Sequence, residues 1–348
     1  MDIRLQRLTE WVRHIPGFET ASPEPVSGDA SFRRYFRVWQ STTDKAPVPF
    51  IVMDAPPEHE DCRPFVAIAR HWRQQDIMVP AIAAKDLALG FLLLEDFGDQ
   101  LMLPALAQTN AETLYRQALD ELVKIGQVSS PGDYPLPPYD EALLDREMAL
   151  FPDWLLEQHL QLTLSNQERA LLDTTFALLK ESALAQPEVT VHRDYHSRNL
   201  LVLAGSKRPG VIDFQDAVRG PVTYDVVSLL KDCYVRWPEH QIADWLEYFR
   251  TAGLAAGLHR ADPDTFRQWF ELMGMQRHLK AAGIFARLAI RDGKTGYLDD
   301  IPRTVSYLRD ASARQPALRH FHEWLCDRVL PAIEQRIGPV PGQESSQL

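Results

Sequence analysis

The stretch VHRDYHSRNLLV, residues 191–202, and the shorter VIDF, residues 211–214, decide the fold of this chain. The apolar residues on either side of the polar ones predict short buried strands. Between these strands lie Asp194, then Asn199 five positions later, then Asp213 fourteen positions after that. This set suits phosphoryl transfer from ATP, because one carboxylate can orient an acceptor hydroxyl while hard oxygen ligands hold Mg²⁺ against the phosphates.

The motif is specific because it requires residue type, spacing and strand context together. A lone H-x-D arises often by chance, whereas H-x-D-x-x-x-x-N followed by an apolar strand and I-D-F does not. The alternative is a loop whose Asp and Asn residues only stabilise turns, which is a common use of both. We assign Asp194 as the candidate general base and Asn199 and Asp213 as the candidate Mg²⁺ ligands. Asp216 is a weaker candidate, because it could instead cap a helix or pair with a base.

Residues near this set are expected to support it. We expect His192 to brace the loop through hydrogen bonds and Arg193 to form a local salt bridge. Asp225 follows a Gly-Pro turn at the start of a helix, so its carboxylate should accept hydrogen bonds from backbone N–H groups, with those of the catalytic loop as one option. His196 either reaches the acceptor or is simply exposed, and the sequence favours neither outcome.

These residues resemble the catalytic and metal loops of the aminoglycoside phosphotransferase/choline kinase family, which is related to the protein kinases. SGDASFRRYFRV (27–38) is similar to the nucleotide loop of that family, LLLEDF (92–97) to its adenine-binding strand and hinge, and GPVTYD (220–225) to the turn after the metal Asp. The resemblance implies a protein-kinase-like, two-lobed α+β fold with ATP and Mg²⁺ as cofactors. The nucleotide-binding candidates that it implies are Ser31, Arg33, Glu95 and Phe97.

Four segments point to a closer resemblance: SGDASFRRYFRV (27–38), VMDAPPE (52–58), VIDFQDA (211–217) and MGMQRHLKAAGIFARL (273–288). In this combination, nearly the whole chain resembles the bacterial anomeric kinases of N-acetylmuramate and N-acetylglucosamine. That resemblance implies a cytoplasmic cell-wall recycling enzyme that phosphorylates the C1 hydroxyl of a small-molecule amino sugar. Another hydroxyl acceptor (an aminoglycoside, choline or homoserine) and a nucleotide-binding regulator without catalysis stay open as alternatives. Arg277, Lys280 and Arg287 in the segment 273–287 could meet a carboxylate such as a lactyl group. For any one of them, a place on a solvated helix face is the more frequent outcome.

One departure from the family concerns the phosphate-binding lysine. Kinases of this superfamily usually carry a Lys on the third strand, and the expected position here is near Met53, where no Lys is present. Either Arg33, Arg34 or Arg37 supplies the charge, or Mg²⁺ and backbone amides suffice, or the protein binds nucleotide without catalysis. The third option is the least favoured, because the complete motif would then have no chemical purpose.

Composition limits the other classes of function. The 348 residues carry 37 basic and 48 acidic side chains, a net charge of −11, which argues against a nucleic-acid-binding protein. Three widely spaced cysteines suggest neither a disulfide framework nor a metal cluster. We see no apolar run long enough for a membrane span and no signal peptide, and no protein partner is evident.

The periodicity predicts a small α+β lobe at 1–98 and a helical catalytic and acceptor-binding lobe at 99–337, with a disordered tail at 338–348. In the first lobe we expect a helix at 2–15 that packs on the lobe, three strands within 26–54, a helix at 61–75, a strand at 90–95 and a hinge at 95–99. In the second lobe the helices are expected at 111–127, 140–159, 166–184 and 223–235, and then onward to about residue 334.

Overall fold

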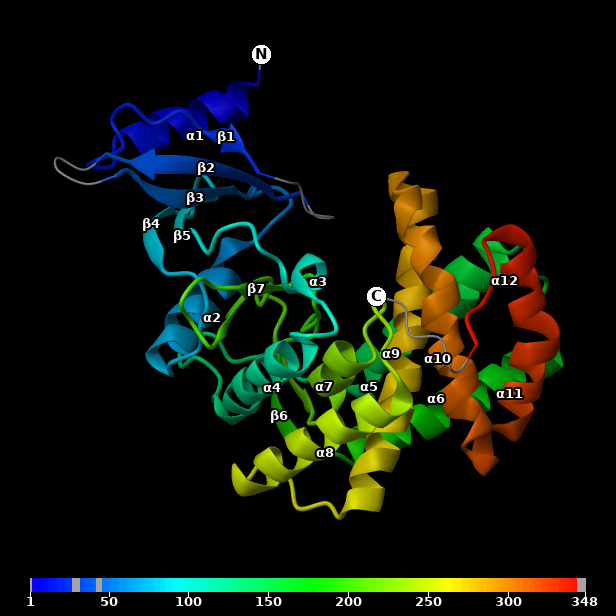
Figure 1. Cartoon of the computed structure of the whole chain (residues 1–348). Helices are drawn as coiled ribbons and strands as arrows, with labels where there is room; N and C mark the ends of the chain where they lie inside the picture. Colours follow the sequence, from blue (N-terminus) through cyan, green and yellow to red (C-terminus); the bar gives the residue numbers. More distant parts are fainter. Residues whose placement is uncertain (1, 27–31, 42–45, 343–348) are drawn as a thin grey trace. The chain divides into compact units, whose positions relative to one another are not determined.

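The computed structural model describes residues 2–26, 32–41 and 46–342 and divides into two compact units (Figure 1). Unit 1 comprises Met1–Gln100, Ser130–Pro135 and Leu201–Asp216. Unit 2 comprises Leu101–Ser129, Leu136–Leu200 and Ala217–Leu348. The nucleotide-loop residues 27–31 and the end of the predicted tail, 343–348, lie outside the described residues.

Unit 1 is built on a five-stranded antiparallel sheet with the strand order β1-β2-β3-β5-β4. Its strands are β1 Glu24–Pro25, β2 Arg34–Gln40, β3 Val48–Asp54, β4 Ile82–Asp86 and β5 Phe91–Glu95. Alternate residues of a strand face the same side, and Phe36, Val38 and Val52 are buried together with Leu8 and Val12 of helix α1 (Ile3–Arg13). The predicted N-terminal helix therefore does pack on the sheet, as expected.

Helix α2 (Cys62–Gln74) completes the core of unit 1 and supports one of the motif segments. Asp61 caps its first turn by accepting a hydrogen bond from a backbone N–H. Phe65 and Trp72 from this helix pack on Phe214, with ring centroids 4.7 and 5.7 Å apart. Because Phe214 is wholly buried, this packing fixes the backbone directly after Asp213.

Two small sheets flank the polar motif, as the apolar pattern predicted. Strand β6 (Glu188–Val191) pairs antiparallel with β9 (Val218–Pro221). Strand β7 (Leu200–Val202) pairs with β8 (Pro209–Val211). The catalytic loop is thus the connection between β6 and β7, and the segment that carries the second Asp follows β8.

Unit 2 is mostly helical. Its helices are α3 Met102–Ala105, α4 Ala111–Gln127, α5 Glu141–Met148, α6 Asn166–Leu184, α7 Tyr224–Leu230, α8 Glu239–Ala255, α9 Pro263–Asp292, α10 Ile301–Ala313, α11 Arg319–Trp324 and α12 Leu330–Arg336. Shorter π- or 3₁₀-helical segments are η1 Phe151–His159, η2 Thr295–Asp300, η3 Pro316–Leu318 and η4 Leu325–Val329. The predictions 111–127 and 166–184 match α4 and α6, whereas 140–159 is divided between α5 and η1, and 223–235 shortens to α7.

Helix α9, the long yellow-to-orange helix in Figure 1, packs against α5, η1, α6, α7 and α10. Gly283 permits one of these close approaches, because a Cβ there would lie 2.3 Å from the carbonyl carbon of Leu150. With neighbours on several sides, α9 has little solvated face. The expectation that Arg277 and Lys280 lie on such a face is therefore wrong: they are only 6% and 8% exposed.

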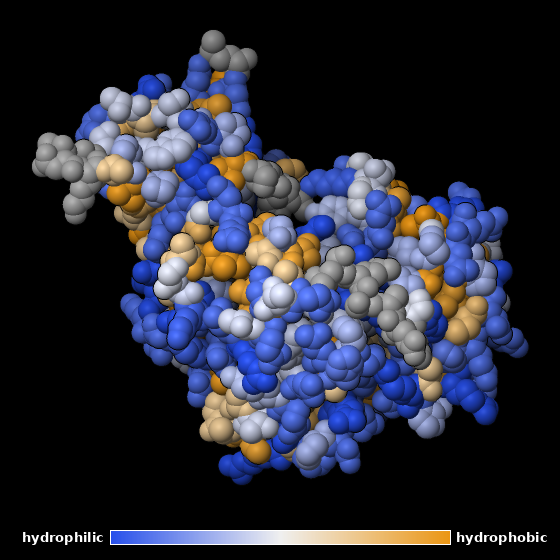
Figure 2. All heavy atoms as spheres, in the orientation of Figure 1, coloured by the Kyte–Doolittle hydropathy of each residue, from blue (hydrophilic) through white to orange (hydrophobic). Residues whose placement is uncertain are grey.

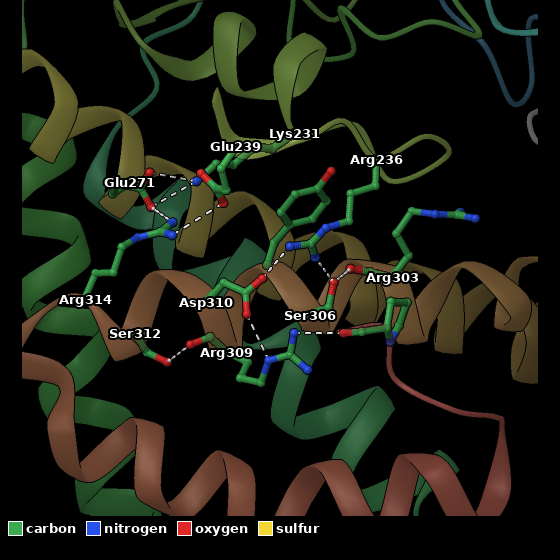
Figure 3. Close-up of polar contacts among 12 residues, drawn as sticks. Lys231, Arg236, Glu239, Glu271, Arg303, Ser306, Arg309, Asp310, Ser312 and Arg314 are labelled. Atoms are coloured by element: carbon green, nitrogen blue, oxygen red, sulfur yellow. Dashed lines mark hydrogen bonds and ion pairs between the residues drawn. The ribbon is translucent and has the colours of Figure 1, made fainter. Parts of the chain in front are cut away.

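Buried ion pairs attach the segment after α7 to its neighbours (Figure 3). Arg236 reaches Ser306 and Asp310 of α10. Lys231 donates to Glu271 of α9 at 2.9 Å. Since charged hydrogen bonds between buried groups are geometrically specific, these pairs fix the segment 231–236, which lies beside the catalytic loop.

The described surface is mainly hydrophilic on the face drawn in Figure 2, with apolar residues in smaller groups. Among the described residues, no helix has both the length and the apolar character that crossing a membrane requires. The described part of the predicted tail includes Pro341, whose carbonyl accepts a hydrogen bond of 2.8 Å from Arg309.

Candidate active site

The catalytic loop of unit 2 is held by Asp225 at the start of α7. Its carboxylate accepts hydrogen bonds from the backbone N–H groups of His192 and Arg193, at 2.6 and 3.0 Å. Arg193 has a φ of +79°, a left-handed conformation that costs a non-glycine residue about 1–3 kcal/mol. The two hydrogen bonds hold this backbone in place, which confirms the role expected for Asp225. Burial raises the pKa of Asp225 to about 6 against the pull of His192 and these N–H groups.

His192 and Arg193 also have the supporting roles that the sequence predicted. The backbone N–H of Asp194 donates to Nδ1 of His192 at 3.3 Å, so the imidazole braces the loop from within. Arg193 forms its salt bridge with Glu147 of α5, with 2.6 Å between Nη2 and Oε1. The loop is thereby attached to α7 through its backbone and to α5 through a side chain.

Glu147 is the centre of a buried polar network that sequence reasoning did not find. It is 5% exposed and accepts contacts from Arg193, from Lys280 at 3.0 Å and from the hydroxyl of Tyr139. Burial raises its pKa, but Lys280 and Arg193 outweigh burial and hold the pKa below the ordinary value. No pattern marked this residue, because a Glu within a periodic helix normally indicates a solvated position.

Asp194 is half-buried at the centre of the loop, with several cations around it. Burial raises its pKa, but Lys280, together with Arg193 and Arg277, lowers it to about 2. The carboxylate is therefore ionised at neutral pH. A base this weak contributes little driving force for removing a proton, so its contribution is to accept a hydrogen bond from an acceptor hydroxyl and align it.

Asn199 lies at the end of the same loop. Its Nδ2 donates to the carbonyl oxygen of Asp194 at 3.0 Å, and its backbone N–H donates to the carbonyl of His196 at 2.9 Å. The first contact uses the amide nitrogen, and Oδ1 is the atom with which Asn199 would coordinate a hard cation. Between these residues, Ser197 donates from both N and Oγ to the buried Asp232, at 3.0 and 2.5 Å. Asp232 is a second supporting residue that the sequence did not single out.

Asp213 lies in unit 1, two residues after the end of β8, with a φ of +65°. Its Oδ1 accepts a hydrogen bond of 2.8 Å from Nε2 of Gln215 and lies 3.8 Å from Nη1 of Arg33. Arg33 also pairs with Glu60 at 2.9 Å. Gln215 donates at 3.1 Å to Asp216, the weaker metal candidate. These contacts orient the Asp213 carboxylate, and they place a cation beside it.

The three arginines considered as replacements for the missing lysine differ in their contacts. Met53, at the expected lysine position, is buried. Arg34 and Arg37 each bridge two carboxylates elsewhere in unit 1. Arg33 forms an ion pair with Asp213, and its pKa stays above the ordinary value although burial lowers it. Arg33 is therefore the best placed of the three to meet phosphate near Asp213.

The other predicted nucleotide-binding residues also belong to unit 1. Ser31 lies outside the described residues. Glu95 ends β5, where its carboxylate pairs with Arg73 at 2.9 Å and accepts from a backbone N–H at 3.1 Å. Phe97 packs on β8, where a Cβ added to Gly210 would come within 2.5 Å of its ring. Their roles towards a nucleotide stay predictions.

The donor set fits Mg²⁺ in its chemistry. Within the described residues there is no group of three or more His, Cys, Asp or Glu side chains that could hold a metal ion. Mg²⁺ bound with a nucleotide does not require one, because it takes one or two protein oxygens together with phosphate and water. The carboxamide of Asn199 and the carboxylate of Asp213 each offer an oxygen of this kind.

Close relatives match almost the whole chain. It is 44% identical over 340 residues to a Pseudomonas putida protein named N-acetylmuramate/N-acetylglucosamine kinase, which covers 94% of this chain and 97% of the relative. It is 48% identical over 337 residues to the Pseudomonas aeruginosa protein of the same name, with coverages of 93% and 96%. The Neisseria meningitidis protein of that name is 41% identical over 328 residues, with coverages of 93% and 95%.

Solved structures support the same fold, and the family follows from the sequence. A choline kinase from Cryptosporidium parvum superposes with a TM-score of 0.62 at 14% identity, covering 92% of this chain and 99% of that one. A spectinomycin phosphotransferase gives 0.62 at 15% identity, with coverages of 89% and 98%. The predicted kinase-like α+β fold is thus confirmed. The family model described as "Phosphotransferase enzyme family" matches residues 22–269, and the chain belongs to this family.

Proposed function

We propose that this chain is an ATP-dependent kinase that transfers the γ-phosphate to the anomeric (C1) hydroxyl of N-acetylmuramate and N-acetylglucosamine, in the recycling of peptidoglycan. The observation that carries the proposal is the 41–48% identity, over more than nine-tenths of the chain, to relatives named as kinases of these two sugars. ATP is the donor that the family implies. The preserved set of Asp194, Asn199 and Asp213 supports it, because this set is what phosphoryl transfer requires.

Asp194 acts in this proposal on the acceptor. Its ionised carboxylate accepts a hydrogen bond from the sugar hydroxyl and aligns the oxygen for attack on the γ-phosphate. In a loose transition state, alignment contributes more than early removal of the proton. The low pKa of Asp194, about 2 after Lys280 and the arginines outweigh burial, supports this division of roles.

Asn199 and Asp213 are proposed to hold Mg²⁺ together with the phosphates of ATP. When bound, the ion offsets the negative charge that develops on the leaving oxygen. The order of elements supports this assignment, since Asn199 directly precedes β7 and Asp213 follows β8, the strand that pairs with β7. Arg33 is proposed as the cation that replaces the usual lysine. Ser31, Glu95 and Phe97 remain proposed nucleotide-binding residues.

The functions of the two parts of the chain are also proposals. We assign residues 1–98 to nucleotide binding and 99–337 to catalysis and acceptor binding. The position of all five strands of the large sheet before residue 98 supports the first assignment. A cytoplasmic location is proposed because the reaction consumes ATP.

The deciding experiment is release of ADP in the presence of Mg²⁺ and a panel of acceptors: N-acetylmuramate, N-acetylglucosamine, glucosamine, kanamycin, choline and homoserine. The proposal predicts turnover with the two N-acetylated sugars. The product should be a sugar 1-phosphate, identified in NMR spectra by coupling between phosphorus and the anomeric proton. Preferred turnover of choline, homoserine or kanamycin would replace this function by another of the same fold, and ATP binding without turnover would favour a regulator.

A further inference from the structure

Arg277 differs from the other buried cations of the described residues. Four Lys or Arg residues are buried: Lys231, Arg236, Arg277 and Lys280. Three of them pair with a carboxylate, namely Glu271, Asp310 and Glu147. Among the described residues, no carboxylate oxygen lies within 4.0 Å of a nitrogen of Arg277. Within the described part of the chain, its Nε has no hydrogen-bond partner, and its Nη1 contacts Sγ of Cys233 at 3.9 Å.

A guanidinium in this state is costly to the fold. Moving a charge out of water is unfavourable unless a partner compensates it, and a thiol at 3.9 Å is a weak acceptor. Asp194 compensates Arg277 only at longer range, as one of several groups whose charges affect each other. The free-energy cost of burying Arg277 is explained if its partner is an anionic group of a bound ligand.

The groups around Arg277 suit a polar ligand. Nδ1 of His196 and Oε1 of Gln276 are also buried without a hydrogen-bond partner. His196 is in the catalytic loop, two residues after Asp194, and its ring packs edge-on to Tyr234 at 5.4 Å between centroids. Gln276 precedes Arg277 on α9 but faces another direction, where its Nε2 donates to Tyr139 at 2.8 Å and to Glu147 at 3.2 Å. A hydrogen-bonding ligand beside the catalytic loop would satisfy Nδ1 of His196.

The ion pairs of the neighbouring cations bear on the sign of the ligand. Lys280 and Arg193 share Glu147 as their ion-pair partner. Arg277, unlike these two cations, has no carboxylate oxygen within 4.0 Å of its nitrogens among the described residues.

We infer that Arg277 forms, next to His196 of the catalytic loop, a subsite for the carboxylate of an acidic acceptor sugar. The inference rests on the proposed function and makes it more specific. N-acetylmuramate carries a lactyl carboxylate, whereas N-acetylglucosamine is the same ring without it. The planar fork of arginine matches a carboxylate with two parallel hydrogen bonds. Arg277 therefore raises the affinity for the acidic sugar and is dispensable for the neutral one.

The test compares three acceptors that share the ring and the C1 hydroxyl: N-acetylmuramate, its lactyl methyl ester and N-acetylglucosamine. The variants are Arg277→Gln, which removes the charge, and Arg277→Lys, which keeps the charge without the fork. The matched control is Arg291→Gln, the same change on the same helix at a side chain that is 56% exposed and paired with Asp292.

The inference predicts that Arg277→Gln raises KM for N-acetylmuramate about 10- to 100-fold, the range expected when a charged hydrogen-bonded contact is lost. KM for the methyl ester and for N-acetylglucosamine should change less than about threefold, the ordinary scale of a surface effect. Arg277→Lys should give an intermediate rise in KM for the acid alone, and Arg291→Gln should leave all three unchanged. The kcat for the neutral sugar should persist, because the inference gives Arg277 no part in phosphoryl transfer.

Two results would overturn the subsite. An equal loss of kcat with all three acceptors would mean that Arg277 serves the transferred phosphoryl group instead. Unchanged discrimination between the acid and its methyl ester would mean that no carboxylate is bound there. In either case the unaltered enzyme would still phosphorylate amino sugars. The subsite can therefore be refuted without refuting the proposed function. If Arg277→Gln does not fold, as judged by circular dichroism, Arg277→Lys carries the test.

Discussion

Glu147→Gln tests the buried network behind the catalytic loop. The change keeps the size and one oxygen of the side chain but removes its charge. Arg193 and Lys280, which approach the carboxylate at 2.6 and 3.0 Å, then share no anion. Glu147 is 5% exposed, so water cannot replace the lost charge.

The burial of Glu147 sets the size of the expected loss of stability. Removing one partner of a buried ion pair costs about 3–5 kcal/mol, because the remaining charge is left without compensation. In a domain of the size of unit 2, each kcal/mol lowers Tm by about 2–4 °C. We therefore expect a fall in Tm of about 6–20 °C at pH 7.

Glu141→Gln is the matched control, because Glu141 lies on the same helix, α5. It pairs with Lys180 at 2.9 Å, but its side chain is 68% exposed and Lys180 also pairs with Asp145. An exposed pair of this kind contributes about 0–1 kcal/mol. Calorimetry of the three proteins, with circular dichroism as a second probe, should separate the two variants clearly.

The pKa shift of Glu147 also predicts how the loss of stability in Glu147→Gln depends on pH. The folded-state pKa of Glu147 lies below its ordinary value, since Lys280 and Arg193 outweigh burial. Its contribution is therefore present above the unfolded-state pKa, near 4.5, and is lost as the pH falls below it. The deficit of Glu147→Gln should be largest at pH 7 and should shrink towards pH 3. A loss of stability no larger than that of Glu141→Gln, or one independent of pH, would show that the Glu147 charge does not stabilise unit 2.

The remaining predictions concern the loops and the phosphates. Asp213→Ala should weaken Mg²⁺-dependent binding of ATP, measured by calorimetry, whereas binding of the acceptor should persist. Arg33→Met should raise KM for ATP about tenfold by removing one charged contact, with little change in KM for the sugar. Asp225→Asn leaves one of two buried backbone N–H groups without an acceptor, a cost of about 1–3 kcal/mol. Thermal unfolding should show this cost, and kcat should fall because the loop carries Asp194.

The sequence predicted the elements that local rules control. The helices at 111–127 and 166–184 carry regular apolar spacing, and α4 and α6 match them. The short strands around the motif were visible as apolar runs between polar residues. Strand β4 (Ile82–Asp86) was missed, because its alternating half-buried and exposed side chains include Lys85 and Asp86, which lack a strand-like apolar pattern.

The supporting residues of the site could not be predicted, because their partners are distant in the sequence. Glu147 is 46 positions from Arg193, and Asp232 is 35 positions from Ser197. A periodic pattern indicates which side of a helix is apolar but not which charged residues are enclosed when several helices surround it. This is also why the surroundings of Arg277 on α9 differed from expectation.

The role of Asp194 in phosphoryl transfer can be measured through the turnover of Asp194→Asn. The unaltered enzyme and the variant are compared in ADP release with N-acetylglucosamine, with ATP affinity measured in parallel. The account predicts that turnover falls by at least about a thousandfold, in line with the loss of both alignment and proton acceptance, while ATP affinity changes little. Turnover within tenfold of the unaltered enzyme would contradict the assignment of Asp194 and, with it, the proposed mechanism.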